Sequence, residues 1–165
     1  MDINQELKTL YEKDINERNS IDWDHASSTQ IANLRKKDKK RKEKVLALIN
    51  EGKVKSAQDY HHAALIFQHG ESTNDFKKAH ELATKAVALG DESARWLFAA
   101  TLDRYLISMG KPQKYGTQFK LNNNGEWELG EPIDPTVTDK ERAKYNVPPL
   151  SQALQRYKEK YGIKP

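Results

Sequence analysis

The 165-residue chain contains no cysteine, which excludes disulfide bonds and every metal site built on thiolate ligands. It also contains no apolar run approaching the roughly 18 residues that a membrane-spanning helix requires, so we expect no membrane contact. The N-terminal stretch MDINQELKTLYEKD has no apolar segment of the kind found in signal peptides. We therefore expect a cytoplasmic protein, and leave open a signal sequence removed from a longer precursor.

The residues that are present make the chain polar but not disordered in composition: 36% are hydrophobic and 32% are charged. A chain of this length can bury one core, so we expect a single domain. Its expected segments are a helix and linker (residues 1–26), a helical core (27–110), a polar loop with a β-hairpin (111–131) and a helical tail (132–165).

A mainly α-helical fold of antiparallel α/α hairpins is predicted by the hydrophobic periodicity, the helix-capping residues and the short connections. Gly70, Gly90 and Gly110 are placed as glycines that end helices. Alternating apolar residues on either side of Asn124-Gly125 predict a small β-hairpin. The expected helices cover approximately residues 2–18, 28–51, 57–69, 74–89, 92–109, 139–145 and 150–160.

Basic residues concentrate in RKKDKKRKEK, residues 35–44, which holds eight basic and two acidic side chains while the whole chain carries +4. Nucleic-acid-binding surfaces usually have aromatic residues among their basic ones. No aromatic residue lies among these charges. We therefore disfavour nucleic acid as a partner and interpret the segment as the solvated face of a helix. The alternative is RNA or phosphate binding through Lys36, Lys37, Lys39 and Lys40.

Two charged residues interrupt an otherwise apolar helix face that crosses this segment. The face is formed by residues at spacings of three and four: Ile31, Leu34, Asp38, Arg41, Val45 and Leu48. Because most of these residues are apolar, we expect the face to point inward and to bury Asp38 and Arg41 as a pair. The pair is either a salt bridge that clamps neighbouring helices or one wall of a polar pocket.

The stretch DYHHAALIFQHG, residues 59–70, predicts a buried helix that carries three histidines. His62 and His69 are seven residues apart and return to one face, whereas His61 and Gln68 lie about 100° away. No two of these histidines have the i, i+4 spacing of a metal-chelating helix, and His62 and His69 are about 10.5 Å apart along the axis. We therefore expect no metal and no cofactor. The alternatives are hydrogen-bonded core histidines, or a catalytic or substrate-binding role for His69 or His62.

Polar groups also gather in and after the helix predicted at residues 92–109. Asp103 lies beside apolar positions and is expected to orient a catalytic histidine, or else to pair with Arg41 or Arg104. The following loop offers uncharged donors and acceptors for a polar ligand, unless it only satisfies its own backbone. The residues predicted to be catalytic are His69, His62 and Asp103, and those predicted to bind substrate are Asp38, Arg41, Gln68, Arg95, Arg104, Gln113, Tyr115, Thr117 and Gln118.

The middle of the chain resembles Sel1-like repeats, which are related to tetratricopeptide repeats. One helix pair of about 36 residues and the first half of a second pair are visible. The residues that carry the resemblance are Gly70, Asp75, Lys78-Ala79, Lys85-Ala86, Gly90 and Ala94. The resemblance implies α/α hairpins whose core is completed by the flanking helices and the β-hairpin, and it does not by itself imply a scaffold function.

A second resemblance covers about residues 38–119, half of the chain. Its motifs are Asp-x-x-Arg at 38–41, QHG at 68–70, RWL followed by DR at 95–104, and PQxYGTQ at 112–118. In these motifs the chain resembles an uncharacterised bacterial domain family of unknown function. The resemblance implies that the motif residues form one site or one polar core, and it implies no reaction.

Two functions remain as hypotheses. The first is a small acid–base enzyme, of hydrolase or lyase type, that acts on a polar small molecule or peptide. His69 or His62 would be the general base, Asp103 would orient it, and Arg41 or Arg104 would hold an anionic group. Because the sequence has no Ser-His-Asp or Cys-His signature, water or an acidic C–H would supply the proton.

The second hypothesis is a Sel1-like module that binds a protein partner and whose polar cluster is structural. An open cleft at the polar residues favours the enzyme, and a sealed cluster favours the module.

Overall fold

The structure is a computed structural model, and it describes residues 2–23 and 25–161. Its first helices are α1 (Gln5–Asn19), α2 (Ser28–Asn50), α3 (Ala57–Gln68), α4 (Thr73–Ala88) and α5 (Arg95–Ser108), with the 3₁₀ turn η1 (Glu92–Ala94) directly before α5. The antiparallel strands β1 (Phe119–Leu121) and β2 (Trp127–Leu129) form a hairpin, which α6 (Asp139–Ala143) and α7 (Leu150–Tyr161) follow. The predicted fold class, mainly helical with a small β-hairpin, is confirmed.

Local side-chain chemistry determines where the helices begin. Ser27, Ser56, Ser72 and Thr138 each accept a hydrogen bond from the backbone three residues on, and the side chain there returns one, so each forms a capping box. The turn from α3 into α4 requires a glycine at Gly70, because a Cβ there would lie 2.3 Å from the Cβ of Asp75.

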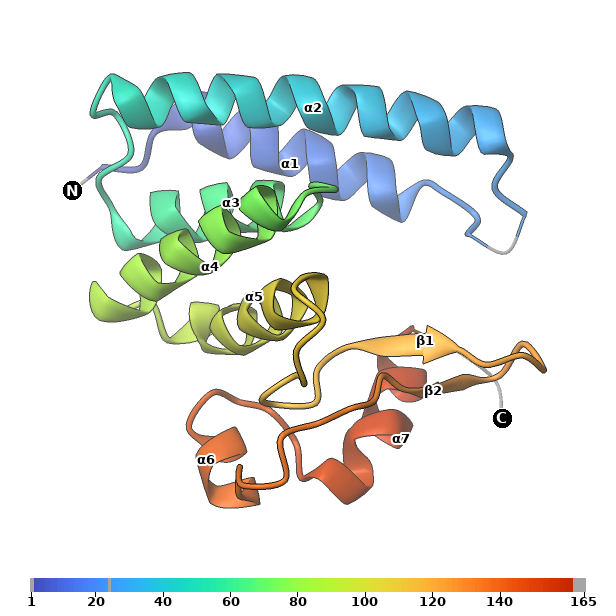
Figure 1. The fold of residues 1–165 in the computed structure, drawn as a ribbon. Helices are drawn as coiled ribbons and strands as arrows, with labels where there is room; N and C mark the ends of the chain where they lie inside the picture. Colours follow the sequence, from blue (N-terminus) through green and yellow to red (C-terminus); the bar gives the residue numbers. More distant parts are fainter. Residues whose placement is uncertain (1, 24, 162–165) are drawn as a thin grey trace.

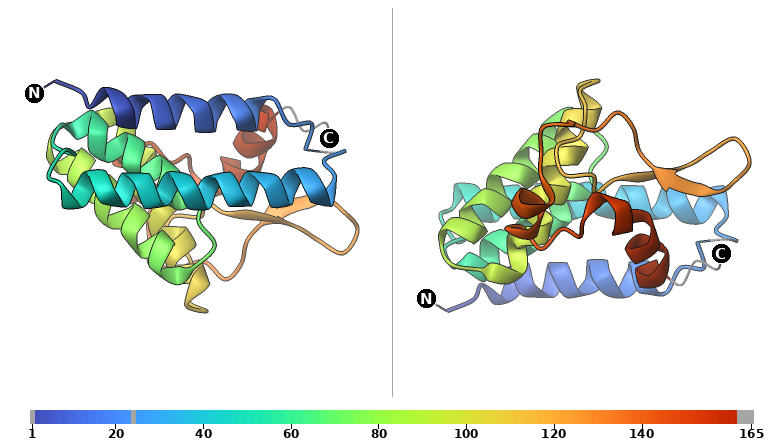
Figure 2. Two further views of the ribbon diagram at one scale, coloured as in Figure 1. Left: turned by 90° about the horizontal axis from the view of Figure 1, so that it is seen from above. Right: turned by 90° about the horizontal axis from the view of Figure 1, so that it is seen from below.

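The helices stack in sequence order from α1 and α2 towards the hairpin and α7 (Figure 1). α1 and α2 contact each other and both contact α3, α3 packs on α4, and α4 packs on α5. α7 contacts β2 and lies on the side of the molecule opposite α1 and α2 (Figure 2). The polar loop between α5 and β1 therefore lies between the helical stack and the C-terminal elements.

Apolar packing forms two clusters. The larger one joins α1 to α5 and includes the fully buried Leu7, Val45 and Ala63. The smaller one connects α5 to the C-terminal segment through Ala99, Tyr115, Val137 and Val147. Burial of such surface, at roughly 25 cal/mol per Å², is the main force that holds the elements together. Within the described ranges, no helix has the length and apolar character needed to span a membrane.

Candidate functional site

The charged residues predicted on the inward face of α2 are buried. Asp38 and Arg41 are each 6% exposed, and Nη1 of Arg41 donates a hydrogen bond to Oδ1 of Asp38 at 2.8 Å. The expected contact between two side chains three residues apart on a helix is confirmed. The pair is not isolated, because α1 brings further charged side chains to it.

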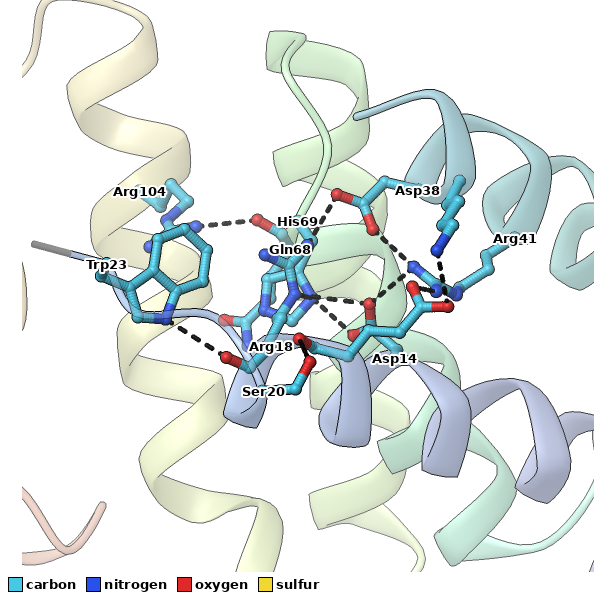
Figure 3. Close-up of polar contacts among 11 residues, drawn as sticks. Asp14, Arg18, Ser20, Trp23, Asp38, Arg41, Gln68, His69 and Arg104 are labelled. Atoms are coloured by element: carbon cyan, nitrogen blue, oxygen red, sulfur yellow. Dashed lines mark hydrogen bonds and ion pairs between the residues drawn. The ribbon is translucent and has the colours of Figure 1, made fainter. Parts of the chain in front are cut away.

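Three charged residues of α1 complete this arrangement, and none of them was among the predicted site residues. Nη1 of Arg41 donates to Oδ1 of Asp14 at 3.0 Å, and its Nη2 donates to Glu17. Nη2 of Arg18 donates to Oδ2 of Asp38 at 2.7 Å (Figure 3). We call Asp14, Glu17, Arg18, Asp38, Arg41 and His69 the ion cluster.

The sequence contained one indication that α1 contributes charged residues to the ion cluster. Leu7, Leu10 and Asp14 follow spacings of three and four on one face of α1, and all three are buried. A carboxylate on such a face needs a cationic partner. Arg18 lies one helical turn further on, with its Nε 3.3 Å from Oδ1 of Asp14. The inward face of α1, like that of α2, thus carries a buried carboxylate with an arginine one turn away.

His69 caps the C-terminus of α3 and enters the ion cluster. Its Nδ1 lies 2.8 Å from Oδ2 of Asp14 and 3.0 Å from Nε of Arg18 (Figure 3). One ring nitrogen cannot donate to a carboxylate and also accept from a guanidinium. Because the Nε–H of Arg18 has a second acceptor in Oδ1 of Asp14, we infer that Nδ1–H of His69 donates to Asp14. In that tautomer Nε2 carries the lone pair.

Burial and the neighbouring charges set the protonation states of this pair. Burial is the largest influence on His69 and lowers its pKa; the hydrogen bond with Asp14 opposes this effect, and the charge of Arg18 adds to it. Burial alone would raise the pKa of Asp14, but its interactions with His69, Arg18 and Arg41 outweigh burial and lower it. At neutral pH the pair is therefore a neutral imidazole against an ionised carboxylate.

Asp14, Asp38 and Arg41 are buried, whereas Glu17, Arg18 and His69 form the partly exposed edge of the ion cluster. Asp14 is 1% exposed, whereas the side chains of His69 and Arg18 are 17% and 19% exposed. Nε2 of His69 has no hydrogen-bond partner among the described residues, and this atom is not fully buried. Asp38 and Arg41 thus act as a clamp between helices rather than as the wall of an open pocket, and His69 is the member that presents a reactive atom to solvent.

Asp103 has a different role from the expected one, because it holds the loop that follows α5. It is fully buried, and its two oxygens accept four hydrogen bonds from residues 114–117 at 2.6–2.9 Å. The expectation that Asp103 would orient His69 or pair with Arg41 is wrong, since the loop backbone already occupies its lone pairs. Burial raises the pKa of Asp103, and the hydrogen bonds from the loop oppose that shift.

His62 also faces α1 but lies apart from the ion cluster. Its ring stacks on Tyr11 with the centroids 4.1 Å apart, and it is 6% exposed. Burial is the main cause of its lowered pKa, and within the described chain its Nδ1 has no hydrogen-bond partner. With His61 it lines a separate cavity of about 480 Å³. The predicted convergence of His62 with His69 and Asp103 does not occur.

No group of three or more His, Asp or Glu side chains among the described residues is placed to hold a metal ion.

Gln113 and Tyr115 are buried parts of the polar loop. The side-chain amide of Gln113 donates to the carbonyl oxygens of Gln118 and Gly130, and its Oε1 accepts from the backbone of Gln118 at 3.0 Å. Tyr115 packs in the smaller apolar cluster. Of these two residues predicted to bind substrate, Gln113 therefore satisfies loop backbone and connects it to the hairpin, and Tyr115 is a core residue.

Arg104 links the end of α3 to the polar loop. Its Nη1 donates to the carbonyl oxygen of Gln68 at 2.8 Å, and its Nε and Nη2 donate to Oε1 of Gln118 at 3.3 and 3.2 Å. Arg104, Thr117 and Gln118 line a groove of about 840 Å³ that also borders the hairpin and α7. Arg95, in contrast, pairs with the nearby Glu92 at 2.8 Å and belongs to neither the groove nor the ion cluster.

Half of the basic residues at 35–44 take part in ion pairs with neighbouring elements. Arg35 pairs with Glu71 at 2.9 Å, Lys37 with Glu17 at 3.1 Å and Lys42 with Asp75 at 2.6 Å, while Arg41 lies in the ion cluster. The exposed remainder consists of Lys36, Lys39, Lys40 and Lys44. This segment therefore joins helices as well as facing solvent.

Fold and site together define a small helical domain in which three helices enclose an ion cluster and a buried aspartate holds a polar loop. The chain belongs to DUF6624, a family of unknown function, whose model matches residues 1–165. The match covers the whole chain and so extends well beyond the segment at 38–119 that carries the sequence motifs. The comparison with curated proteins found no match, and the comparison with solved structures found none either.

Proposed function

We propose that this protein is an acid–base enzyme, of hydrolase or lyase type, that acts on a polar small molecule or peptide with His69 as the general base. One observation supports the proposal: Nδ1 of His69 is held by the ionised Asp14, and its Nε2 has no partner among the described residues. A carboxylate in this position fixes the tautomer of a histidine base and stabilises the imidazolium that forms when the base accepts a proton.

In the proposed reaction, Nε2 of His69 takes a proton from water or from an acidic C–H of the substrate, while Nδ1–H stays bonded to Asp14. The lowered pKa of His69 keeps the ring neutral at pH 7 and therefore ready to accept that proton. Of the two arginines expected to hold an anionic group, Arg41 is sealed in the ion cluster. Arg104 is the better candidate, because it donates to the carbonyl of Gln68, the residue directly before His69.

The test is a screen of the full-length protein against chromogenic esters, amides, phosphate esters and short peptides. Turnover of any of them should fall about 100-fold or more in His69→Gln, the usual contribution of a general base. His61→Gln, a change of the same kind within α3, should retain activity. Full activity in His69→Gln, or ¹⁵N NMR spectra that show the proton of His69 on Nε2 instead of Nδ1, would contradict the proposal.

A second candidate function is a Sel1-like helical module that binds a protein partner. The near-complete burial of Asp14, Asp38 and Arg41 favours it, because buried charges that pair with one another are suited to holding helices together. If His69→Gln lowers stability strongly and no turnover is found for any substrate class, the structural role of the cluster gains support.

A further inference from the structure

A groove of about 840 Å³ lies between α5, residues 116–119, the hairpin and α7. Hollows of this size accept molecules of the size of metabolites or drugs. α5 contributes Trp96 and Arg104 to its lining, and α7 contributes Arg156 and Tyr157. Neither Arg156 nor Tyr157 was among the residues predicted from the sequence.

The charges along this groove are of one sign. Arg104 and Arg156 line it, and none of its described lining residues is a carboxylate. Arg104 already donates to Gln68 and Gln118, whereas Arg156 makes no ion pair or hydrogen bond with any described residue. A guanidinium without a partner beside a hollow is suited to a carboxylate or phosphate, which accepts two parallel N–H bonds from it.

Aromatic rings line the same groove. Phe119 stacks on Tyr157 with the centroids 4.1 Å apart, and Trp127 approaches the same ring at 5.2 Å. Trp96 lines the groove from α5. Such rings offer flat apolar surface on which an aromatic ligand can stack, and a small inorganic anion would leave that surface unused.

The loop that forms part of the groove is held in place before any ligand arrives. Four hydrogen bonds to Asp103 hold residues 114–117. Gly116, at φ +74°, lets α7 approach so closely that a Cβ would lie 2.8 Å from Cδ1 of Leu150. A site on such a fixed loop loses little conformational entropy when it binds a ligand.

From these observations we propose that the groove binds a small aromatic anion, an aryl carboxylate or aryl phosphate. Its ring lies against Trp127 and Tyr157, and its anionic group pairs with Arg156. This inference goes beyond the proposed acid–base function and does not depend on it.

The experiment measures binding to the full-length protein by NMR titration and tryptophan fluorescence, with phenyl phosphate and benzoate as probes, which share a phenyl ring and differ in the anionic group. We expect saturable binding of at least one probe with a Kd of about 1 mM or lower. Inorganic phosphate, which has no ring, and benzyl alcohol, which has no charge, should bind at least about tenfold more weakly. The tighter of the two probes identifies whether the site prefers a phosphate or a carboxylate.

Matched variants locate the site. Arg156→Gln and Trp127→Leu should each weaken binding about fivefold or more, because one removes the ion pair and the other a stacking surface. Lys158→Gln makes the same charge change on α7 at a residue outside the groove lining and should leave the Kd unchanged. His69→Gln should bind the probes with the Kd of the parent protein, because His69 does not line the groove. Failure of the acid–base proposal is therefore distinguishable from failure of this one. Absence of saturable binding by both probes at millimolar concentration, or equal losses in Arg156→Gln and Lys158→Gln, would overturn the proposal.

Discussion

Arg41 shows how single residues hold the ion cluster together. Its guanidinium contacts the carboxylates of Asp14, Glu17 and Asp38 while the residue stays 6% exposed. Removal of one partner from a buried ion pair is far more damaging than loss of a surface pair, because the remaining charges keep their desolvation cost without compensation. Among the described residues, Arg18 would then be the one remaining arginine that pairs with both Asp14 and Asp38.

Replacement of Arg41 by methionine should therefore lower the free energy of unfolding by about 3 kcal/mol. Urea denaturation followed by circular dichroism measures the effect. The matched control is Lys36→Met, which removes the same charge from an exposed position on α2 and should produce no measurable change. Similar losses in the two variants would mean that Arg41 acts through net charge and not through the ion cluster.

At the scale of elements, the loop at residues 114–117 has no regular secondary structure, but four hydrogen bonds to one carboxylate hold it. Its backbone N–H groups cannot pair within a helix or strand, so they need acceptors from elsewhere. The buried carboxylate of Asp103, near the end of α5, supplies them. The loop that this carboxylate holds lines the groove and carries Gly116, on which α7 packs.

In Asp103→Ala, the buried N–H groups of the loop lose their acceptor, and the free energy of unfolding should fall by at least about 2 kcal/mol. Hydrogen exchange at the amides of Tyr115 and Thr117 should become at least about tenfold faster, since the loop then opens locally. Asp134→Ala, which removes a carboxylate that accepts from Thr136 at an exposed turn, is the control and should leave these amides protected. Unchanged exchange in Asp103→Ala would refute the anchoring role.

At the scale of the whole molecule, buried titratable groups make stability depend on pH. Burial is the largest cause of the lowered pKa values of His62, His69 and His80. Below the ordinary value of 6.5, the unfolded chain therefore binds more protons than the folded chain, and stability falls as the pH falls through that window. Asp38 and Asp103, whose pKa values burial raises, act in the opposite sense, so that stability falls as the pH rises from 3.8.

The free energy of unfolding should be smaller at about pH 5.5 than at about pH 7.5, as expected when histidines with lowered pKa values dominate. A double variant, His62→Gln with His80→Gln, leaves the ion cluster intact and should show a smaller difference between the two pH values. Chemical denaturation at both pH values measures the effect. If the double variant keeps the full difference, these two histidines are not its source.

The sequence by itself determined the elements and the faces of the helices. Capping boxes at Ser27, Ser56 and Ser72 act within a single helical turn, so they can be read from neighbouring residues. The contact between Asp38 and Arg41 was predictable for the same reason, because residues three apart on a helix share a face.

Only the tertiary structure decided which faces meet. Periodicity shows that a helix face is buried, but it does not show which element covers it, since that depends on how all the helices pack together. Packing of α1 beside α2 and α3 brought Asp14 to His69, and the turn after α5 directed Asp103 to its own loop instead. The groove with Arg156 exists only because α7, far along the chain, lies against that loop.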